Sequence, residues 1–225
     1  FITWAFPTWI APLFNRFEPL DEGTLRSRLE NLLARCGFKS NGMYVMDGSR
    51  RSAHGNAYFT GFGRNKRIVF FDTLLEGLEE EQVEAVLAHE LGHFKRRHIL
   101  KMLLVSAGFS LAGLALLGWL SQQPWFYTGL GVARQSDALA LVLFVLMMPV
   151  FTVFLAPLMA AFSRKHEFEA DAFAAEQTHA QALIDGLVNM YRDNASTLTP
   201  DPLYSAFHDS HPPAPVRIAH LSSQA

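Results

Sequence analysis

The chain has 225 residues, of which 50% are hydrophobic and 18% charged, and its formal net charge at pH 7 is −2. This composition excludes a disordered chain and disfavours an ordinary soluble globule. The slight negative charge gives no attraction to nucleic acid, so we expect no nucleic-acid partner. A single cysteine, Cys36, excludes both a disulfide framework and a cysteine-based zinc site, which leaves histidine and carboxylate side chains as metal ligands.

Residues 1–20 are rich in aromatic side chains near their start and contain Pro7 and Pro12. We expect this stretch to be the end of a preceding membrane segment or an interfacial stretch. It lacks the basic region and the small-residue cleavage site of a signal peptide. Because the chain begins with Phe1 rather than Met, we expect it to be a fragment of a longer protein.

Residues 21–98 are more polar and are expected to form the first half of a catalytic domain. Leucines at helical spacing predict an amphipathic helix over 22–36. Runs of β-forming residues predict three strands, the last two joined as a hairpin. The predicted strands cover residues 43–46, 56–62 and 67–71, and residues 63–66 form the hairpin connection. A further helix begins near Glu79, and we expect it to run directly into the apolar segment that follows.

Residues 99–162 contain two long stretches without charge. No Lys, Arg, Asp or Glu occurs over 102–133 or over 138–163. Because a helix needs about 20 apolar residues to cross a bilayer, we expect two long transmembrane helices, at about 99–120 and 138–162. The alternative, two buried helices of a large soluble core, is disfavoured because such cores rarely need two uncharged runs of this length.

Two prolines, Pro149 and Pro157, are expected to kink the second span. Basic residues flank the outer ends of both spans, whereas the loop between them carries only Arg134. The flanking residues are Arg96, Arg97, Lys101, Arg164 and Lys165. The positive-inside rule then places the catalytic side in the cytoplasm, on a multi-pass protein of the bacterial inner membrane or the endoplasmic reticulum.

The central motif is His89-Glu90-Leu91-Gly92-His93. Side chains four residues apart project from one face of a helix, so His89 and His93 can bind one metal ion together. Glu90 lies beside them and can act on a water molecule at the metal, as in zinc peptidases. The five-residue pattern also occurs by chance, so a third ligand is required to support this interpretation.

Residues 163–225 are expected to form the second half of the domain and to supply that ligand. Glu167 and Asp171 are four apart on a predicted helix. Glu167 could complete the coordination while Asp171 accepts the N–H of a ligating imidazole. This helix begins where the second span ends, and the motif helix ends where the first span begins. Antiparallel spans would therefore bring the two together, which favours a site over an ordinary solvated acidic helix.

Other nearby residues fit less well. A metzincin needs Gly at position 96 and His at position 99, where this chain has Arg96 and Ile99. On a continuous helix His98 lies about 140° round from His93, so we expect it to point away from the metal. Glu169 also points in a different direction from the predicted ligand on its own helix.

Two histidines, one glutamate and an open position are the ligand set of a hydrolytic zinc site. We therefore expect one Zn²⁺, with Glu90 as the catalytic base. Such a site also needs a hydrogen-bond donor for the oxyanion, and His208 or His211 of the tail could supply it.

These residues resemble the CAAX prenyl protease 1 family, integral-membrane gluzincin zinc endopeptidases, over nearly the whole chain. The matching segments are IAPLF (10–14), FEPL (17–20), RSAHGNAYF (51–59), NKRIVFFDTLL (65–75), SRKHEFEADAF (163–173) and SHPP (210–213) followed by Arg217-Ile218. The resemblance implies a mainly α, zincin-like gluzincin domain with a small β-sheet and two long transmembrane helices. Full members carry further membrane helices before this point, so the chain would be the C-terminal part of a multi-pass protein.

The resemblance also implies roles for single residues. His89, His93 and Glu167 would bind zinc, and Glu90 would be the base. Asp171 would orient a ligand, and a proton-donor role is also proposed for it. His211 falls on the family's SHPP histidine, near the substrate carbonyl, which favours it over His208. Asn56, Ala57 and Tyr58 fall where the family pairs a substrate backbone by strand addition.

The expected function is hydrolysis near the C-terminus of prenylated CAAX proteins, or of other peptide or membrane-associated substrates. One alternative is a membrane quality-control metalloprotease of the heat-shock type with the same ligands, which would not prefer prenylated peptides. Another is a non-catalytic membrane module in which zinc only clamps two helices.

Overall fold

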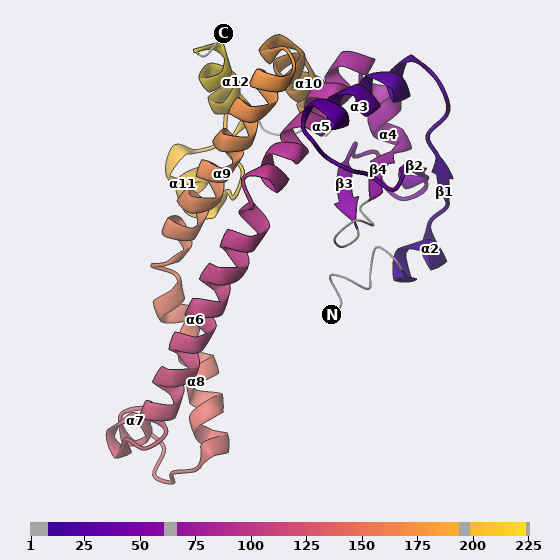
Figure 1. The fold of residues 1–225 in the computed structure, drawn as a ribbon. Helices are drawn as coiled ribbons and strands as arrows, with labels where there is room; N and C mark the ends of the chain where they lie inside the picture. The colour runs from indigo at the N-terminus through magenta and orange to yellow at the C-terminus, as the bar shows by residue number, and fades with distance from the viewer. Residues whose placement is uncertain (1–8, 61–66, 194–198, 224–225) are drawn as a thin grey trace.

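A computed structural model describes residues 9–60, 67–193 and 199–223. Figure 1 shows a mainly helical chain with one small sheet, which confirms the predicted class. In chain order the elements are α2 (Ala11–Phe14), β1 (Phe17–Pro19), α3 (Thr24–Arg35), β2 (Met43–Met46), η2 (Gly48–Arg50), β3 (Ala57–Thr60), β4 (Arg67–Phe71), α4 (Asp72–Gly77), α5 (Glu80–Lys95), α6 (His98–Leu120), α7 (Pro124–Gly129), α8 (Asp137–Thr152), α9 (Ala156–Gln177), α10 (Ala180–Asp193), α11 (Pro202–His208) and α12 (Ala214–Ser222).

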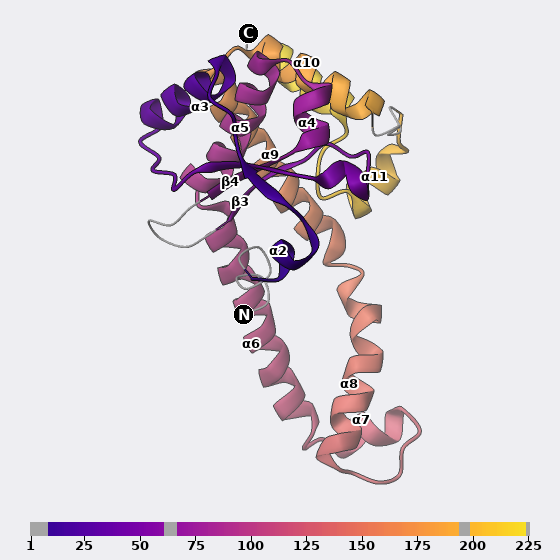
Figure 2. The ribbon, with the colours of Figure 1, turned by 90° about the vertical axis from the view of Figure 1, so that its right-hand side faces the viewer.

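Most elements gather at one end of the molecule, around the sheet. From there α6 extends away as one long arm, α9 and then α8 form a second arm, and the two arms are joined at their far end through α7 (Figures 1 and 2). Phe126 and Tyr127 of α7 are buried there against residues of both arms, and the Tyr127 hydroxyl donates to the Ser121 carbonyl at 2.7 Å. The two arms are therefore held together at their far end by a small apolar cluster of their own.

In the described part of the chain the sheet has the strand order β1-β2-β4-β3. β2 and β4 are parallel, with Met43 opposite Ile68, and the two outer pairs are antiparallel. The predicted strands at 43–46 and 67–71 are confirmed, and the strand predicted over 56–62 is observed at 57–60. The hairpin connection at 63–66 lies outside the described residues. β3 is thus a strand at the edge of the sheet.

The helix predicted over 22–36 is observed as α3, and its Leu29 and Leu32 are fully buried. Their stripe packs on α5, which also contacts α9 and α10. α5 begins with a capping box in which the Glu79 and Gln82 side chains satisfy each other's backbone N–H groups. Because almost every residue from Gln82 to Gly92 is buried, α5 forms the centre of the packed domain.

The chain does not run straight from α5 into the first span, as the sequence led us to expect. α5 ends at Lys95, and Arg97 adopts a left-handed conformation with φ of 56° before α6 begins at His98. A non-glycine residue in this region is uncommon and costs about 1–2 kcal/mol. The helical periodicity of α5 therefore does not continue into α6.

The second apolar stretch is bent, as its prolines predicted. It consists of α8 and the beginning of α9, which are bent by 62° at the break between them. Pro157 stands in the first turn of α9, where its missing N–H costs no hydrogen bond. α9 then continues without interruption to Gln177, so the predicted third ligand lies in the middle of a helix and not at its start.

Only part of the predicted transmembrane pair is supported by helix length. Among the described residues α6 is long and apolar enough to cross a membrane, and a second span is obtained if α8 and α9 are taken together despite their bend. None of the most apolar stretch of α6 is buried inside the structure, and Leu103, Leu111 and Leu114 are more than 60% exposed.

Gly92 allows α5 and α9 to approach each other closely. A Cβ atom at this position would lie 2.9 Å from the backbone Cα of Ala170 and 3.1 Å from its carbonyl oxygen. Because both contacts are with backbone, neither can be relieved by rotating a side chain. The two helices would have to move apart.

We predict that Gly92→Ala lowers the thermal unfolding midpoint in detergent, because this overpacking costs about 1–3 kcal/mol. Gly108→Ala is the matched control, since a Cβ at that helical position meets nothing within 4 Å. There the better helix propensity of alanine should leave the midpoint unchanged or raise it. An equal response of both variants would show that the approach of α5 to α9 does not require glycine.

Candidate metal centre

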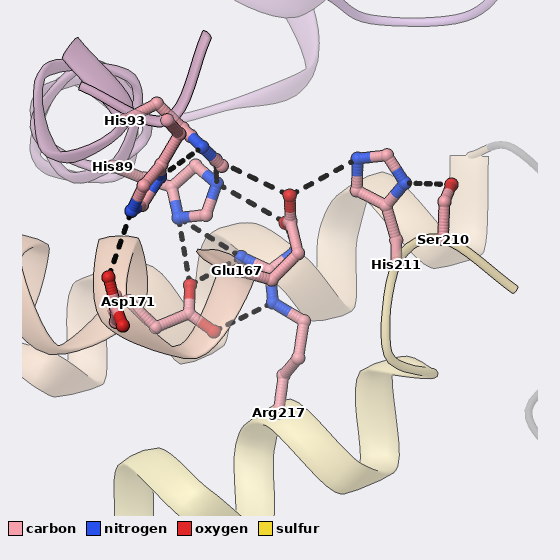
Figure 3. A network of polar contacts seen from close by, with 9 residues as sticks. His89, His93, Glu167, Asp171, Ser210, His211 and Arg217 are labelled. Carbon is pink, nitrogen blue, oxygen red and sulfur yellow. Dashed lines mark hydrogen bonds and ion pairs between the residues drawn. The ribbon is translucent and has the colours of Figure 1, made fainter. Parts of the chain in front are cut away.

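The three predicted ligands lie together between α5 and α9 (Figure 3). His89 Nε2 is 3.1 Å from His93 Nε2 and 3.5 Å from Glu167 Oε2, and His93 Nε2 is 3.4 Å from Glu167 Oε1. One potential ligand atom from each residue falls within 4.8 Å of the others. The packing of α5 against α9 thus brings together His89 and Glu167, which are 78 positions apart in the sequence.

The donor atoms fit a metal ion better than they fit one another. Glu167 is 4% exposed, and its Oε2 atom is buried without a hydrogen-bond partner in the described structure. Leaving a buried carboxylate oxygen unpaired costs about 1–3 kcal/mol or more. A divalent cation between the two Nε2 atoms and the Glu167 carboxylate would satisfy it, and nitrogen with carboxylate oxygen is a donor set that zinc accepts.

Asp171 orients the first histidine. Its Oδ1 atom is 2.8 Å from His89 Nδ1, and the carboxylate is completely buried. If Nδ1 carries the proton and donates it to Asp171, the lone pair of Nε2 points toward Glu167 and His93. This is the arrangement that the sequence suggested for Asp171, one helical turn beyond Glu167.

Arg217 of α12 binds the other side of Asp171, and the sequence assigned it no role. Its Nε donates to Asp171 Oδ2 at 2.8 Å, and its Nη2 donates to Oδ1, so the pair is bidentate. Arg217 is only 8% exposed, and its Nη1 lies 3.8 Å from Glu167 Oε2. A buried guanidinium from the tail therefore compensates the carboxylate that holds His89.

These charges also affect protonation. Burial lowers the pKa of the His89 imidazole, but the contacts with Asp171 and Glu167 outweigh it, and the pKa is raised above its usual value. Burial likewise opposes the charge on Arg217, but Asp171 holds its pKa above the ordinary range. The same carboxylates that favour a proton on His89 would favour a divalent cation at the site.

Glu90 lies between the two histidines in sequence and is half-buried. Glu90 forms no hydrogen bond or ion pair with the described residues. Asp171 is instead contacted by His89, the residue that precedes Glu90. A carboxylate that is not engaged elsewhere is free to act on a water molecule or a substrate.

Of the two tail histidines, the structure brings His211 to the site. Its Nε2 is 3.4 Å from Glu167 Oε1, and its Nδ1 is 3.1 Å from the Ser210 hydroxyl (Figure 3). The side chain is 68% exposed. Arg164 holds the preceding turn by donating to the carbonyl oxygens of Ser205, Ala206 and Asp209. His208 instead contacts the rings of Tyr204 and Phe207.

The predicted substrate strand lies beside the same helix. Ala57 and Tyr58 are in β3, and Asn56 directly precedes it. β3 packs against α5, which carries His89 and His93, and it pairs only with β4 among the described strands. The N–H of Phe71 donates to the Asn56 carbonyl at 2.9 Å, so this carbonyl faces the sheet.

Comparison with known proteins agrees with this geometry. The family model of peptidase family M48 matches residues 19–225. The chain belongs to peptidase family M48. Membership in this family implies a bound metal ion, for which His89, His93 and Glu167 are the cluster in the described structure.

The M48 relatives include CAAX prenyl protease 1 of Saccharomyces cerevisiae, which is 36% identical over 96% of this chain and 51% of its own length. The CAAX prenyl protease 1 homolog of Homo sapiens is 33% identical over 97% of this chain and 54% of its own length. This chain is also similar to the crystal structure of S. mikatae Ste24p, with a TM-score of 0.87 and 35% identity. The match covers 98% of this chain and 55% of the Ste24p chain. The chain thus spans about half the length of the relatives it matches.

The expectation for His98 in this M48 chain needs one correction. His98 contributes no atom to the candidate metal cluster, as expected, but its side chain turns back to the histidine pair: it is 3% exposed, and its Nδ1 is 3.0 Å from His93 Nδ1. The expected direction holds only for a continuous helix, and the left-handed Arg97 interrupts it. Glu169, which points away from the ligands as expected, accepts a hydrogen bond from His98 Nε2 at 3.0 Å.

We predict that Arg217→Met destabilises the protein by about 3–5 kcal/mol, because it leaves the Asp171 carboxylate buried without its charged partner. The midpoint of thermal unfolding should fall, and metal should be lost more easily. Arg50→Met is the control, since Arg50 pairs with Asp47 at an exposed position and should contribute about 1 kcal/mol or less. Equal effects of the two substitutions would contradict a structural role for the Arg217–Asp171 pair.

Proposed function

We propose that this chain is the catalytic part of a membrane zinc endopeptidase that hydrolyses peptide bonds. The observation that carries the proposal is the convergence of His89, His93 and Glu167, with Glu90 beside them and Asp171 behind His89. Membership in family M48 supports the same activity. The names of the relatives favour CAAX proteins as the substrate class over the broader substrates of a heat-shock-type protease.

One zinc ion would be held by the Nε2 atoms of His89 and His93 and by the Glu167 carboxylate. When bound, it would lower the pKa of a water molecule and polarise the scissile carbonyl. Glu90 would accept a proton from the attacking water and transfer it to the leaving amine.

Two further groups would assist from opposite sides. His211 Nε2, on the exposed side of Glu167, would donate a hydrogen bond to the substrate carbonyl oxygen as negative charge develops. Asp171 would keep His89 in the tautomer that ligates. Because both oxygens of Asp171 already accept hydrogen bonds, from His89 and Arg217, a positioning role is favoured over proton donation.

β3 would bind the substrate backbone by strand addition. In an antiparallel pair, the backbone groups of successive residues point alternately toward and away from the partner strand. Since the Asn56 carbonyl faces β4, the N–H of Tyr58 also faces β4, and the N–H of Ala57 points outward. An extended peptide could accept a hydrogen bond from Ala57.

The bilayer would surround α6 and the α8–α9 arm, whose large apolar side chains are exposed along the described helices. Arg97 and Lys101 stand at the beginning of α6, and Arg164 and Lys165 stand in α9 beside the metal ligands. By the positive-inside rule this end would face the cytoplasm, in the endoplasmic reticulum or a bacterial inner membrane. Substrates would be peptides or membrane-associated proteins held at that surface, prenylated ones included.

We predict that Glu90→Gln in the full-length protein lowers the rate of peptide hydrolysis by about 100-fold or more, because the general base is lost. Zinc content should stay near one ion per chain, since Glu90 is not a ligand. Glu167→Ala should instead lose zinc. The assay uses farnesylated and unmodified peptides, with and without a chelator, and metal content is measured on the same samples.

Hydrolysis by Glu90→Gln at the parental rate would contradict the enzyme proposal and favour a zinc clamp. Unchanged zinc in Glu167→Ala would remove this residue from the coordination shell. Equal hydrolysis of farnesylated and unmodified peptides would favour the quality-control alternative.

For the substrate strand, we predict that Ala57→Pro lowers kcat/KM for a peptide by about 2- to 10-fold, the value of one hydrogen bond. Thermal stability is measured in parallel, because Ala57 donates nothing to the sheet but is only 7% exposed and packs in the core, where a proline ring can overpack. Tyr58→Pro is the control, since it removes a donor to β4 and should lower the unfolding midpoint. Parental kcat/KM in a folded Ala57→Pro variant would argue against strand addition at this edge.

A further inference from the structure

His93 has its own hydrogen-bonded support, separate from that of His89. His93 Nδ1, on the far side of the ring from Glu167, is 3.0 Å from His98 Nδ1. The other nitrogen of His98, Nε2, is 3.0 Å from Glu169 Oε2. The three side chains therefore form a chain of two contacts that leads away from the metal centre.

The hydrogen-bonding capacities allow one consistent assignment of protons. If the Nε2 lone pair of His93 points at the metal centre, its proton is on Nδ1 and is donated to His98 Nδ1. His98 then carries its own proton on Nε2 and donates it to the Glu169 carboxylate. Each ring is neutral, and each nitrogen has a partner or a place at the metal.

The two ligating histidines are thereby supported in parallel ways. His89 donates directly to a buried carboxylate, Asp171, whereas His93 reaches a carboxylate through one intervening imidazole. Lys101 and Lys165 lie 3.6 and 3.9 Å from Glu169 and favour its ionised form.

The position of His98 is set by its neighbours. The ring of His166 stacks on it with centroids 4.1 Å apart and planes inclined by 12°. The left-handed conformation of Arg97 turns the chain so that the first residue of α6 faces back to α5. The left-handed conformation is unfavourable for a residue with a side chain such as Arg97, and the contacts of His98 can offset this local free-energy cost.

We propose that His98 is a positioning residue, which with Glu169 fixes the tautomer and the ring orientation of His93 for metal binding. This inference rests on the proposed metal centre. Groups that hold the distal nitrogen of a ligating histidine typically contribute 10- to 100-fold to metal affinity.

The test measures zinc affinity of the full-length protein in detergent by competition with a chromophoric chelator. His98→Phe should weaken zinc binding by about 10- to 100-fold. His98→Gln should restore much of the loss, because its amide oxygen can accept from His93 and its amide nitrogen can donate to Glu169. The absorption spectrum of the Co²⁺-substituted protein should shift in His98→Phe and return toward the parental spectrum in His98→Gln.

His166→Phe is the matched control, since it keeps a ring stacked on His98 without a hydrogen bond to a ligand, and it should retain parental affinity. Should His98→Phe fail to fold, Glu169→Ala removes the terminal acceptor and should still weaken zinc binding by about threefold or more. Parental affinity in a folded His98→Phe or in Glu169→Ala would overturn the inference.

The same titration separates this inference from the proposed function. His93→Ala removes a ligand and should abolish tight zinc binding. If His93→Ala loses zinc while His98→Phe does not, the positioning role fails and the metal centre stands. If His93→Ala binds zinc like the parent, the metal centre itself fails.

Discussion

The close packing of α5 against α9 is the constraint on which the rest of the site depends. His89 and His93 lie on one helix and Glu167 and Asp171 on the other, and neither helix could form the centre alone. Gly92, between the two histidines, faces the backbone of Ala170 and permits this approach. A small shift along or between the helices would separate nitrogen and carboxylate atoms that now lie within 3.5 Å.

Electrostatics explains why the buried polar groups form a connected set. Glu167 and Asp171 are two buried carboxylates, and the described structure places one buried arginine, Arg217, between them. The imbalance leaves negative charge at the two histidines, which is the condition that favours a bound cation. The bidentate pair with Arg217 also ties α12, near the end of the chain, to the centre of the domain.

The two histidines proposed as ligands are supported by different parts of the fold. Asp171, behind His89, is held inside the packed domain by α12. His98, behind His93, belongs to the first turn of α6, which is the helix that would enter the bilayer. In our interpretation this gives the metal centre one anchor in the globular domain and one at the base of the membrane arm.

The sequence by itself determined the types of ligand, their spacing and the elements that carry them. His89 could be paired with His93, and Glu167 with Asp171, because residues four apart on a helix share a face, a rule that needs no knowledge of the neighbours. That the two pairs meet was expected from the antiparallel arrangement of the two apolar segments. The strands at 43–46 and 67–71 could be predicted from local composition for the same reason.

Only the tertiary structure decided the roles of Arg217, His98 and Glu169. The partner of a buried arginine comes from another segment, and no periodicity indicates which one. The contact of His98 with His93 was not predicted, because the expectation extended one helix through Arg97, where a single left-handed residue changes the direction of every side chain that follows. The prolines predicted that the second apolar stretch would be kinked, but not the 62° angle between α8 and α9, which local sequence does not determine.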